Sequence, residues 1–254
     1  MRQPRRLHDL KDYVLVARDG EVGRIEQVYF DDREWIVRYF VVHTGGWLFG
    51  RDLLISPRSV GALDEDNKRI ELDLTREQVE AAPLISREQP PSRHDEVEYH
   101  RHYGFPPYWE AGAVNEPLLT PPPQPFDEAE SESPALRDSG EVIGYHLQAR
   151  DGELGHVDDL VLDDQDWTIR YFVVDTRNWW PGKKVLIAPA WVDRVSWVDR
   201  AIFVGLGRER IQTAPPYHPD QIISREDELR LYAHYGKEML AAGAPAQGLD
   251  ASQR

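Results

Sequence analysis

The sequence contains no cysteine, which excludes disulfides, thiolate metal sites and cysteine nucleophiles. No stretch approaches the roughly 18 apolar residues that a membrane-spanning helix needs, and residues 1–6 lead into a charged segment rather than an apolar signal core. Basic residues are scarce, since 30 Lys and Arg stand against 45 Asp and Glu and give a net charge of −15. Such a surface repels phosphates, so we expect a soluble cytoplasmic protein with no transmembrane segment and no direct contact with nucleic acid.

An internal repeat is the strongest feature of the 254 residues. The sequence Arg-Asp-Gly-Glu at 18–21 recurs at 150–153, and Tyr-Gly at 103–104 recurs at 235–236, so both offsets (150 − 18 and 235 − 103) equal 132. A constant offset predicts two copies of one fold. The predicted organisation is a first copy at 1–110, a Pro- and acid-rich linker at 111–139, a second copy at 140–240 and a disordered tail at 241–254. Each copy is expected to fold independently.

Short strands followed by helices are predicted within each copy. Asp19-Gly20 supplies a hairpin turn between strands at 13–17 and 21–30, and the apolar spacing of the second strand indicates bulges near Gly23 and Glu26. Further strands are predicted at 35–44 and 53–56, with equivalents at 167–176 and 185–188. Capping-box patterns that begin at Thr75, Ser92 and Ser224 predict short helices. The predicted fold class is mainly β, with two small β-barrels in tandem, each followed by short helices.

Several motifs occur in both copies and resemble the PRC-barrel domain: Asp-Gly-Glu-x-Gly, a two-aspartate turn, Arg-Tyr-Phe-Val-Val-x-Thr, and Leu-Ile-x-Pro at 54–57 and 186–189. The family includes the cytoplasmic barrel of the photosynthetic reaction centre H subunit and the C-terminal domain of a ribosome-maturation factor. The resemblance implies a barrel that packs against other macromolecules, without shared catalysis. We therefore expect no enzyme and no cofactor, but a protein-protein interaction or assembly module with an unidentified protein partner. The alternatives are an RNA-processing or ribosome-associated accessory protein and an unrecognised hydrolase that uses turn aspartates.

Carboxylates are candidates for chemistry in two places. Paired acids for glycoside hydrolysis are available in the two-aspartate turns, although turn formation is the favoured interpretation for Asp31, Asp32, Asp163 and Asp164. The sequence Val-Val-Asp-Thr at 173–176 begins like an aspartic-protease motif, but Arg177 stands where that motif has glycine. Neither pattern is therefore expected to be catalytic.

Histidines and two arginines complete the polar candidates. Glu98, His100 and His102 are weak metal-ligand candidates on a predicted helix, where a solvated, salt-bridged helix is the favoured interpretation and no metal site is expected. Arg38 and Arg170 interrupt apolar strands. They are expected either to alternate toward solvent or to be buried against Asp31 and Asp163.

Large apolar residues occupy the loop after the long central strand in both copies. Trp47 and Trp179 are predicted to fill an open end of their own barrel. The predicted interaction surface consists of their large apolar neighbours and the end of the first copy: Leu48, Phe49, Trp180, Tyr108 and Trp109. Because small open barrels leave strand edges, the two copies are expected to associate about a pseudo-twofold axis, and a homodimer of the whole chain is a further expectation.

Overall fold

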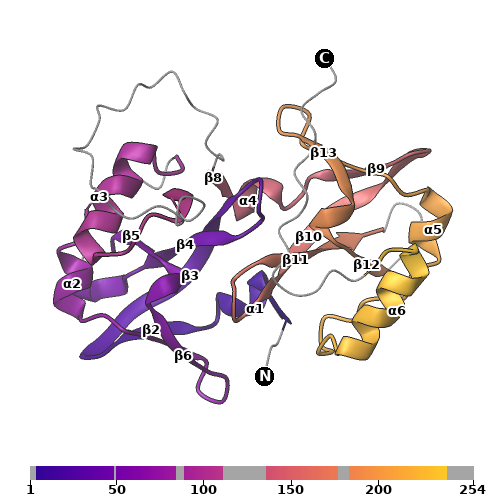
Figure 1. Ribbon diagram of the computed structural model, residues 1–254. Helices are drawn as coiled ribbons and strands as arrows, with labels where there is room; N and C mark the ends of the chain where they lie inside the picture. Colours follow the sequence, from indigo (N-terminus) through magenta and orange to yellow (C-terminus); the bar gives the residue numbers. More distant parts are fainter. Residues whose placement is uncertain (1–3, 49, 84–88, 111–135, 177–182, 239–254) are drawn as a thin grey trace, which may run out of the picture.

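Two β-sheets lie side by side in the computed structural model, which describes residues 4–48, 50–83, 89–110, 136–176 and 183–238 (Figure 1). The first copy contains β1 (Pro4–Arg6), α1 (Leu7–Leu10), β2 (Val14–Ala17), β3 (Gly20–Asp31), β4 (Val37–His43), β5 (Asp52–Ile55), β6 (Val60–Asp64), β7 (Arg69–Leu72), α2 (Arg76–Glu80) and α3 (Arg93–Tyr103). The second contains β8 (Leu136–Asp138), α4 (Ser139–Val142), β9 (His146–Ala149), β10 (Gly152–Asp163), β11 (Ile169–Asp175), β12 (Lys184–Ile187), β13 (Val192–Ser196), β14 (Ala201–Val204), α5 (Arg208–Gln212) and α6 (Arg225–Tyr235). Short 3-10 turns cover Gly45–Leu48, Pro57–Ser59, Tyr108–Glu110 and Pro189–Trp191.

Both sheets have the same strand order, which confirms the mainly β class. The first sheet runs β5-β4-β3-β2-β7-β6 and the second runs β12-β11-β10-β9-β14-β13. Neither sheet closes into the expected barrel: within the described residues no ladder joins β5 to β6, and the 3-10 turn at Pro57–Ser59 instead connects these two edge strands. No helix of the described chain is long and apolar enough to cross a membrane.

The predicted local signals are present in the first sheet. Gly20, the first residue of β3, follows the hairpin turn at Arg18-Asp19 and has a φ of 153°. The register of β3 shifts by one residue at Val22 against β2 and at Glu26 against β4. Two bulges therefore bend β3 where the apolar spacing predicts them. Capping boxes confirm the predicted helix starts at Thr75, Ser92 and Ser224.

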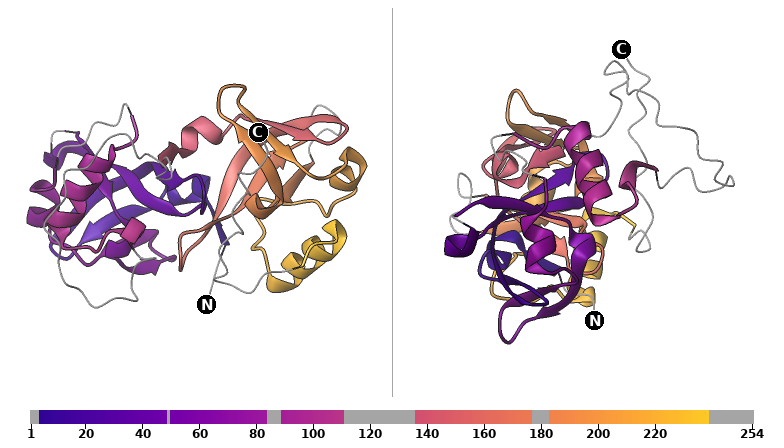
Figure 2. Two further views of the ribbon diagram at one scale, coloured as in Figure 1. Left: turned by 45° about the horizontal axis from the view of Figure 1, so that its top comes forward. Right: turned by 90° about the vertical axis from the view of Figure 1, so that its left-hand side faces the viewer.

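The two copies exchange their first strands. β1 of the first copy pairs with β10, and β8 of the second copy pairs with β3. Ion pairs repeat the reciprocity, because Arg5 Nε lies 3.1 Å from Asp164 and Arg137 Nε lies 3.0 Å from Asp32. Figure 2 shows these short elements between the sheets, with α3 and α6 at opposite outer ends. Reciprocal contacts of equivalent residues confirm the predicted pseudo-twofold association of the copies.

A tryptophan from each copy crosses this junction. The Trp35 ring lies 5.0 Å from the Phe172 ring, and the Trp167 ring lies 4.7 Å from the Phe40 ring. The backbone N–H of Val37 donates to the carbonyl of Trp167 at 2.9 Å, and the N–H of Ile169 donates to the carbonyl of Trp35 at 2.7 Å. Buried residues of both copies therefore form one continuous hydrophobic cluster.

This junction bears on the expectation that each copy folds independently, which stays a prediction. The sequence predicts that each copy folds by itself and that the two copies also associate; in the structure, exchanged strands and a common core join them. Residues 136–139, assigned to the linker from sequence, form β8 and the first residue of α4. Residues 111–135, the remainder of the predicted linker, and the predicted tail at 241–254 lie outside the described residues.

Candidate functional site

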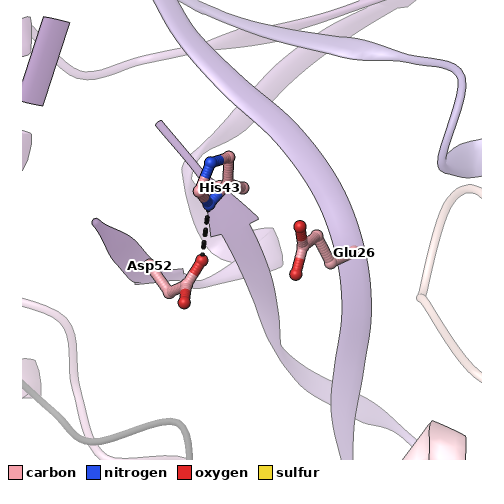
Figure 3. Close-up of side chains that lie close together, drawn as sticks. All are labelled: Glu26, His43 and Asp52. Atoms are coloured by element: carbon pink, nitrogen blue, oxygen red, sulfur yellow. Dashed lines mark hydrogen bonds and ion pairs between the residues drawn. The ribbon is translucent and has the colours of Figure 1, made fainter. Parts of the chain in front are cut away.

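A histidine and two carboxylates converge at one end of the first sheet. Glu26, His43 and Asp52 each offer a ligand atom, and these atoms lie within 4.8 Å of one another. His43 Nδ1 lies 2.9 Å from Asp52 Oδ1, and their side chains are 43% and 18% exposed. In Figure 3 the Glu26 carboxylate points toward the other two side chains. This group has nitrogen and oxygen donors and is open to solvent.

The fold brings these three residues together from three adjacent strands. His43 at the end of β4 is the register partner of Asp52 at the start of β5. Glu26 is the extra residue of a β3 bulge, which re-aims its side chain relative to regular alternation. Gly23 allows the close approach of β3 and β4, since a Cβ there would lie 2.0 Å from the His43 carbonyl oxygen. The group is not evident from the sequence, because bulge register and strand pairing are needed to see it.

A related group lies at the equivalent place in the second copy. His156, Asp158 and Asp175 also bring ligand atoms within 4.8 Å of one another, and Asp158 is again the extra residue of a bulge. Lys184, the register partner of Asp175, places its Nζ 2.6 Å from Asp158 Oδ2. The 132-residue offset relates Glu26 to Asp158, so both copies place a carboxylate at this bulge. The other equivalent positions of the two groups differ in residue type.

A second feature is an open groove at the junction of the copies. Arg38, Arg58, His100 and Tyr108 line it from the first copy, and the turn at residues 164–167 lines it from the second. The guanidinium group of Arg38 lies 4.0 Å from the centre of the Tyr108 ring. Cationic, aromatic and carboxylate side chains therefore share one concave surface that exists only because the copies pack together.

Buried polar contacts hold α3 beside this groove. The hydroxyl groups of Tyr108 and Tyr39 donate to Glu96 Oε1 at 2.7 and 3.1 Å, and Arg93 forms an ion pair with Glu96 at 2.8 Å. His100 Nε2 lies 3.1 Å from the Tyr39 hydroxyl oxygen. The second copy retains the core of this arrangement, where the Tyr171 hydroxyl donates to Glu228 at 2.8 Å.

Burial shifts the pKa values of Glu96 and His100 toward the neutral forms of both side chains. Desolvation raises the pKa of Glu96 above its ordinary value, although Tyr108 and Arg93 act in the opposite direction. Desolvation lowers the pKa of His100. Burial and the polar contacts of Glu96 thus act in opposite directions on its pKa, and burial has the larger effect.

The weak metal candidates are not brought together. His100 is buried against Tyr39, whereas the exposed His102 places Nε2 3.0 Å from the Gln78 carbonyl oxygen. Glu98 instead lies 3.5 Å from His94 Nε2. His100 is two residues from both Glu98 and His102 on α3 and points to a different side of the helix, which explains its separation from them.

The predicted interaction residues have mixed outcomes. Leu48 is 3% exposed and belongs to the hydrophobic core, so it cannot present a surface to a partner. Tyr108 and Trp109 are partly exposed, and the Arg93 guanidinium lies 4.0 Å from the centre of the Trp109 ring. Phe49, Trp179, Trp180 and the Trp47 side chain lie outside what the structure describes.

The aspartates of the turns have structural contacts. Asp31 Oδ1 accepts from the backbone N–H groups of Arg33 and Glu34, and Asp163 Oδ1 accepts from that of Gln165. Asp31, which is fully buried, also pairs with Arg38 at 2.5 Å, so the buried-pair interpretation holds for this arginine. The neighbouring Asp32 and Asp164 form the ion pairs of the junction. The turn interpretation therefore accounts for these carboxylates.

Comparison with known families gives one match. Residues 5–79 match the PRC-barrel domain, a segment that contains β2 to β7 and most of α2. The match does not extend over the second copy, whose sheet nevertheless has the same strand order. No match was found among curated proteins. At the level of the family, the PRC-barrel match indicates a non-catalytic interaction module.

Proposed function

We propose that the chain is a non-enzymatic protein-interaction module in which two PRC-type copies form one platform, and that a partner protein binds over the groove at their junction. The observation that carries this proposal is the partly exposed Arg-aromatic surface at the end of the first copy, next to the groove. Aromatic and arginine side chains are the residues that contribute most to protein interfaces.

Preorganisation supports the same surface. Tyr108 is held by its hydrogen bond to Glu96 and by Arg38, and Trp109 is held between Arg93 and His100. Side chains that are already ordered lose less conformational entropy when a partner binds. The second copy lacks an equivalent aromatic pair, because the segment after Gly236 continues Lys237-Glu238. The Tyr-Trp pair at 108–109 is therefore a feature of the first copy.

The test is affinity purification with tagged full-length chain, followed by titration of the recovered partner against purified protein. Trp109→Ser should weaken partner binding by about tenfold or more. Trp197→Ser is the matched control, because Trp197 is also partly exposed and has the Arg137 guanidinium 4.1 Å from the centre of its ring. Equal loss in both variants, or unchanged binding in Trp109→Ser, would contradict this assignment of the surface.

A further inference from the structure

We propose that Glu26, His43 and Asp52 bind one divalent transition-metal ion, with Zn²⁺ as the chemical type, at the open end of the first sheet. The donor set is one imidazole nitrogen and two carboxylates, which zinc accepts. Three protein ligands leave a coordination position for water or for a donor from another molecule. The site is separate from the groove, whose lining includes none of the three residues.

Distances support a shared ion. Zinc lies about 2.0–2.2 Å from nitrogen and oxygen ligands, so neighbouring donors of a tetrahedral site are separated by roughly 3.3 Å. His43 Nδ1 and Asp52 Oδ1 are hydrogen-bonded at 2.9 Å, so a widening of this pair by a few tenths of an ångström would bring them to that separation. The remaining carboxylate lies within 4.8 Å of both, and rotation about the side-chain bonds of Glu26 can shorten this distance.

The β-bulge is a second observation that supports the site. In regular pairing the side chain of a β3 residue is fixed by alternation, whereas Glu26 is the extra residue and is aimed at the β4–β5 pair. The bulge recurs in β10, where it aims the acidic residue Asp158 at the equivalent place. Both copies thus retain a bulge that places a carboxylate beside the next two strands.

The second copy shows why one ion per chain is expected. Lys184 occupies the position that corresponds to Asp52, and its ammonium group lies 2.6 Å from the Asp158 carboxylate. A resident positive charge repels a divalent cation and occupies one of its ligands.

The experiment is a Zn²⁺ titration of the untagged full-length chain near neutral pH, in competition with a chromophoric chelator. We expect one zinc ion per chain, and His43→Ala should weaken its binding by about tenfold or more, as loss of even an outer-shell partner does. The matched control is His146→Ala, because His146 Nδ1 also lies 2.9 Å from a carboxylate oxygen, that of Glu153, but has no place in a three-residue group among the described residues.

A second measurement keeps the test independent of folding. Zinc should raise the midpoint of thermal unfolding in wild type and in His146→Ala, because an ion that binds only the folded state stabilises it. The near-isosteric Asp52→Asn should reduce both the zinc affinity and the zinc-induced rise in the unfolding midpoint. If His43→Ala does not fold, Asp52→Asn serves as the test of the site. The proposal is overturned if wild type binds no zinc, if His43→Ala and Asp52→Asn bind as wild type does, or if His146→Ala loses binding equally.

Discussion

Glu96 is a buried carboxyl group in a chain that is rich in exposed acids. It is 2% exposed and accepts hydrogen bonds from two tyrosine hydroxyl groups, yet burial still raises its pKa. A raised pKa means that the folded protein binds this proton more tightly than the unfolded chain does. The stabilising contribution of the proton is complete below the unfolded pKa and is lost as the pH rises through the folded pKa.

Glu96→Gln tests this effect, because glutamine preserves an oxygen acceptor for Tyr39 and Tyr108 but cannot titrate. We expect the free energy of unfolding of wild type, relative to that of Glu96→Gln, to increase as the pH falls from about 7 to about 4. Denaturant unfolding at several pH values measures this difference. Glu98→Gln is the control, since Glu98 is a half-exposed carboxyl on the same helix. A constant or decreasing difference would show that Glu96 is not the group responsible.

Residue-level predictions from sequence succeed where the signal is local. Ser92 and Asp95 are three residues apart, and the capping box that they form depends only on the geometry of one helical turn. His43 illustrates the opposite case. The bulge that contains Glu26 follows from the apolar spacing of β3, but the pairing of β4 with β5, which places Asp52 beside His43, does not follow from spacing along the chain. The His100–His102 cluster does not form because proximity in sequence does not place side chains on one face.

Strand prediction shows the same division at the scale of elements. The bulges of β3 are predictable, because a register shift in a long amphipathic strand interrupts the regular alternation of its apolar residues. β1 and β8 are not, because three residues such as Pro-Arg-Arg carry no periodicity and their partners lie in the other copy. The sequence also does not determine whether each sheet closes into a barrel. Closure depends on hydrogen bonding between the two edge strands, which are β5 and β6 in the first sheet and β12 and β13 in the second.

The turns between the long strands are structural elements of the junction. Trp35 and Trp167 both adopt a φ of 58°, a conformation that is costly for a bulky residue. Each side chain is nevertheless almost completely buried against a phenylalanine of the other copy. Packing across the junction thus offsets the local strain of the turn.

Trp35→Ala should therefore lower the free energy of unfolding by about 3–5 kcal/mol. The Trp167→Ala variant should behave similarly, because its contacts are the pseudo-twofold equivalents. Equilibrium unfolding in guanidinium chloride measures the loss, with Val198→Ser as a control, because the side chain of Val198 is 94% exposed and its replacement should change stability by about 0.5 kcal/mol or less. A loss below about 1 kcal/mol in both Trp35→Ala and Trp167→Ala would show that packing of these rings across the junction contributes little to the free energy of unfolding.

The whole molecule is two interdigitated copies rather than two separate units. Each sheet takes a strand from the other copy, and the hydrophobic core crosses the junction without a break. A truncated chain that ends near residue 110 would lose β8, which covers part of β3, and one that starts at 139 would lose both β1 and β8. Exposed strand edges of this kind favour association with another chain. The full chain satisfies both edges internally, so the homodimer expected from sequence stays a separate prediction.

Cleavage between the copies tests this architecture on the intact protein. A protease site placed within residues 111–135 and cut after folding should leave the two halves bound to each other, because the exchanged strands, the reciprocal arginine-aspartate pairs and the shared core remain. In size-exclusion chromatography in native buffer, the cleaved protein should elute at the same volume as the uncut chain. Denaturing electrophoresis of the same sample should show two fragments. The same cleavage in the Trp35→Ala variant should weaken the association of the halves. Two separately eluting, folded fragments from the wild-type chain would instead establish that each copy is self-sufficient and that the junction contributes little.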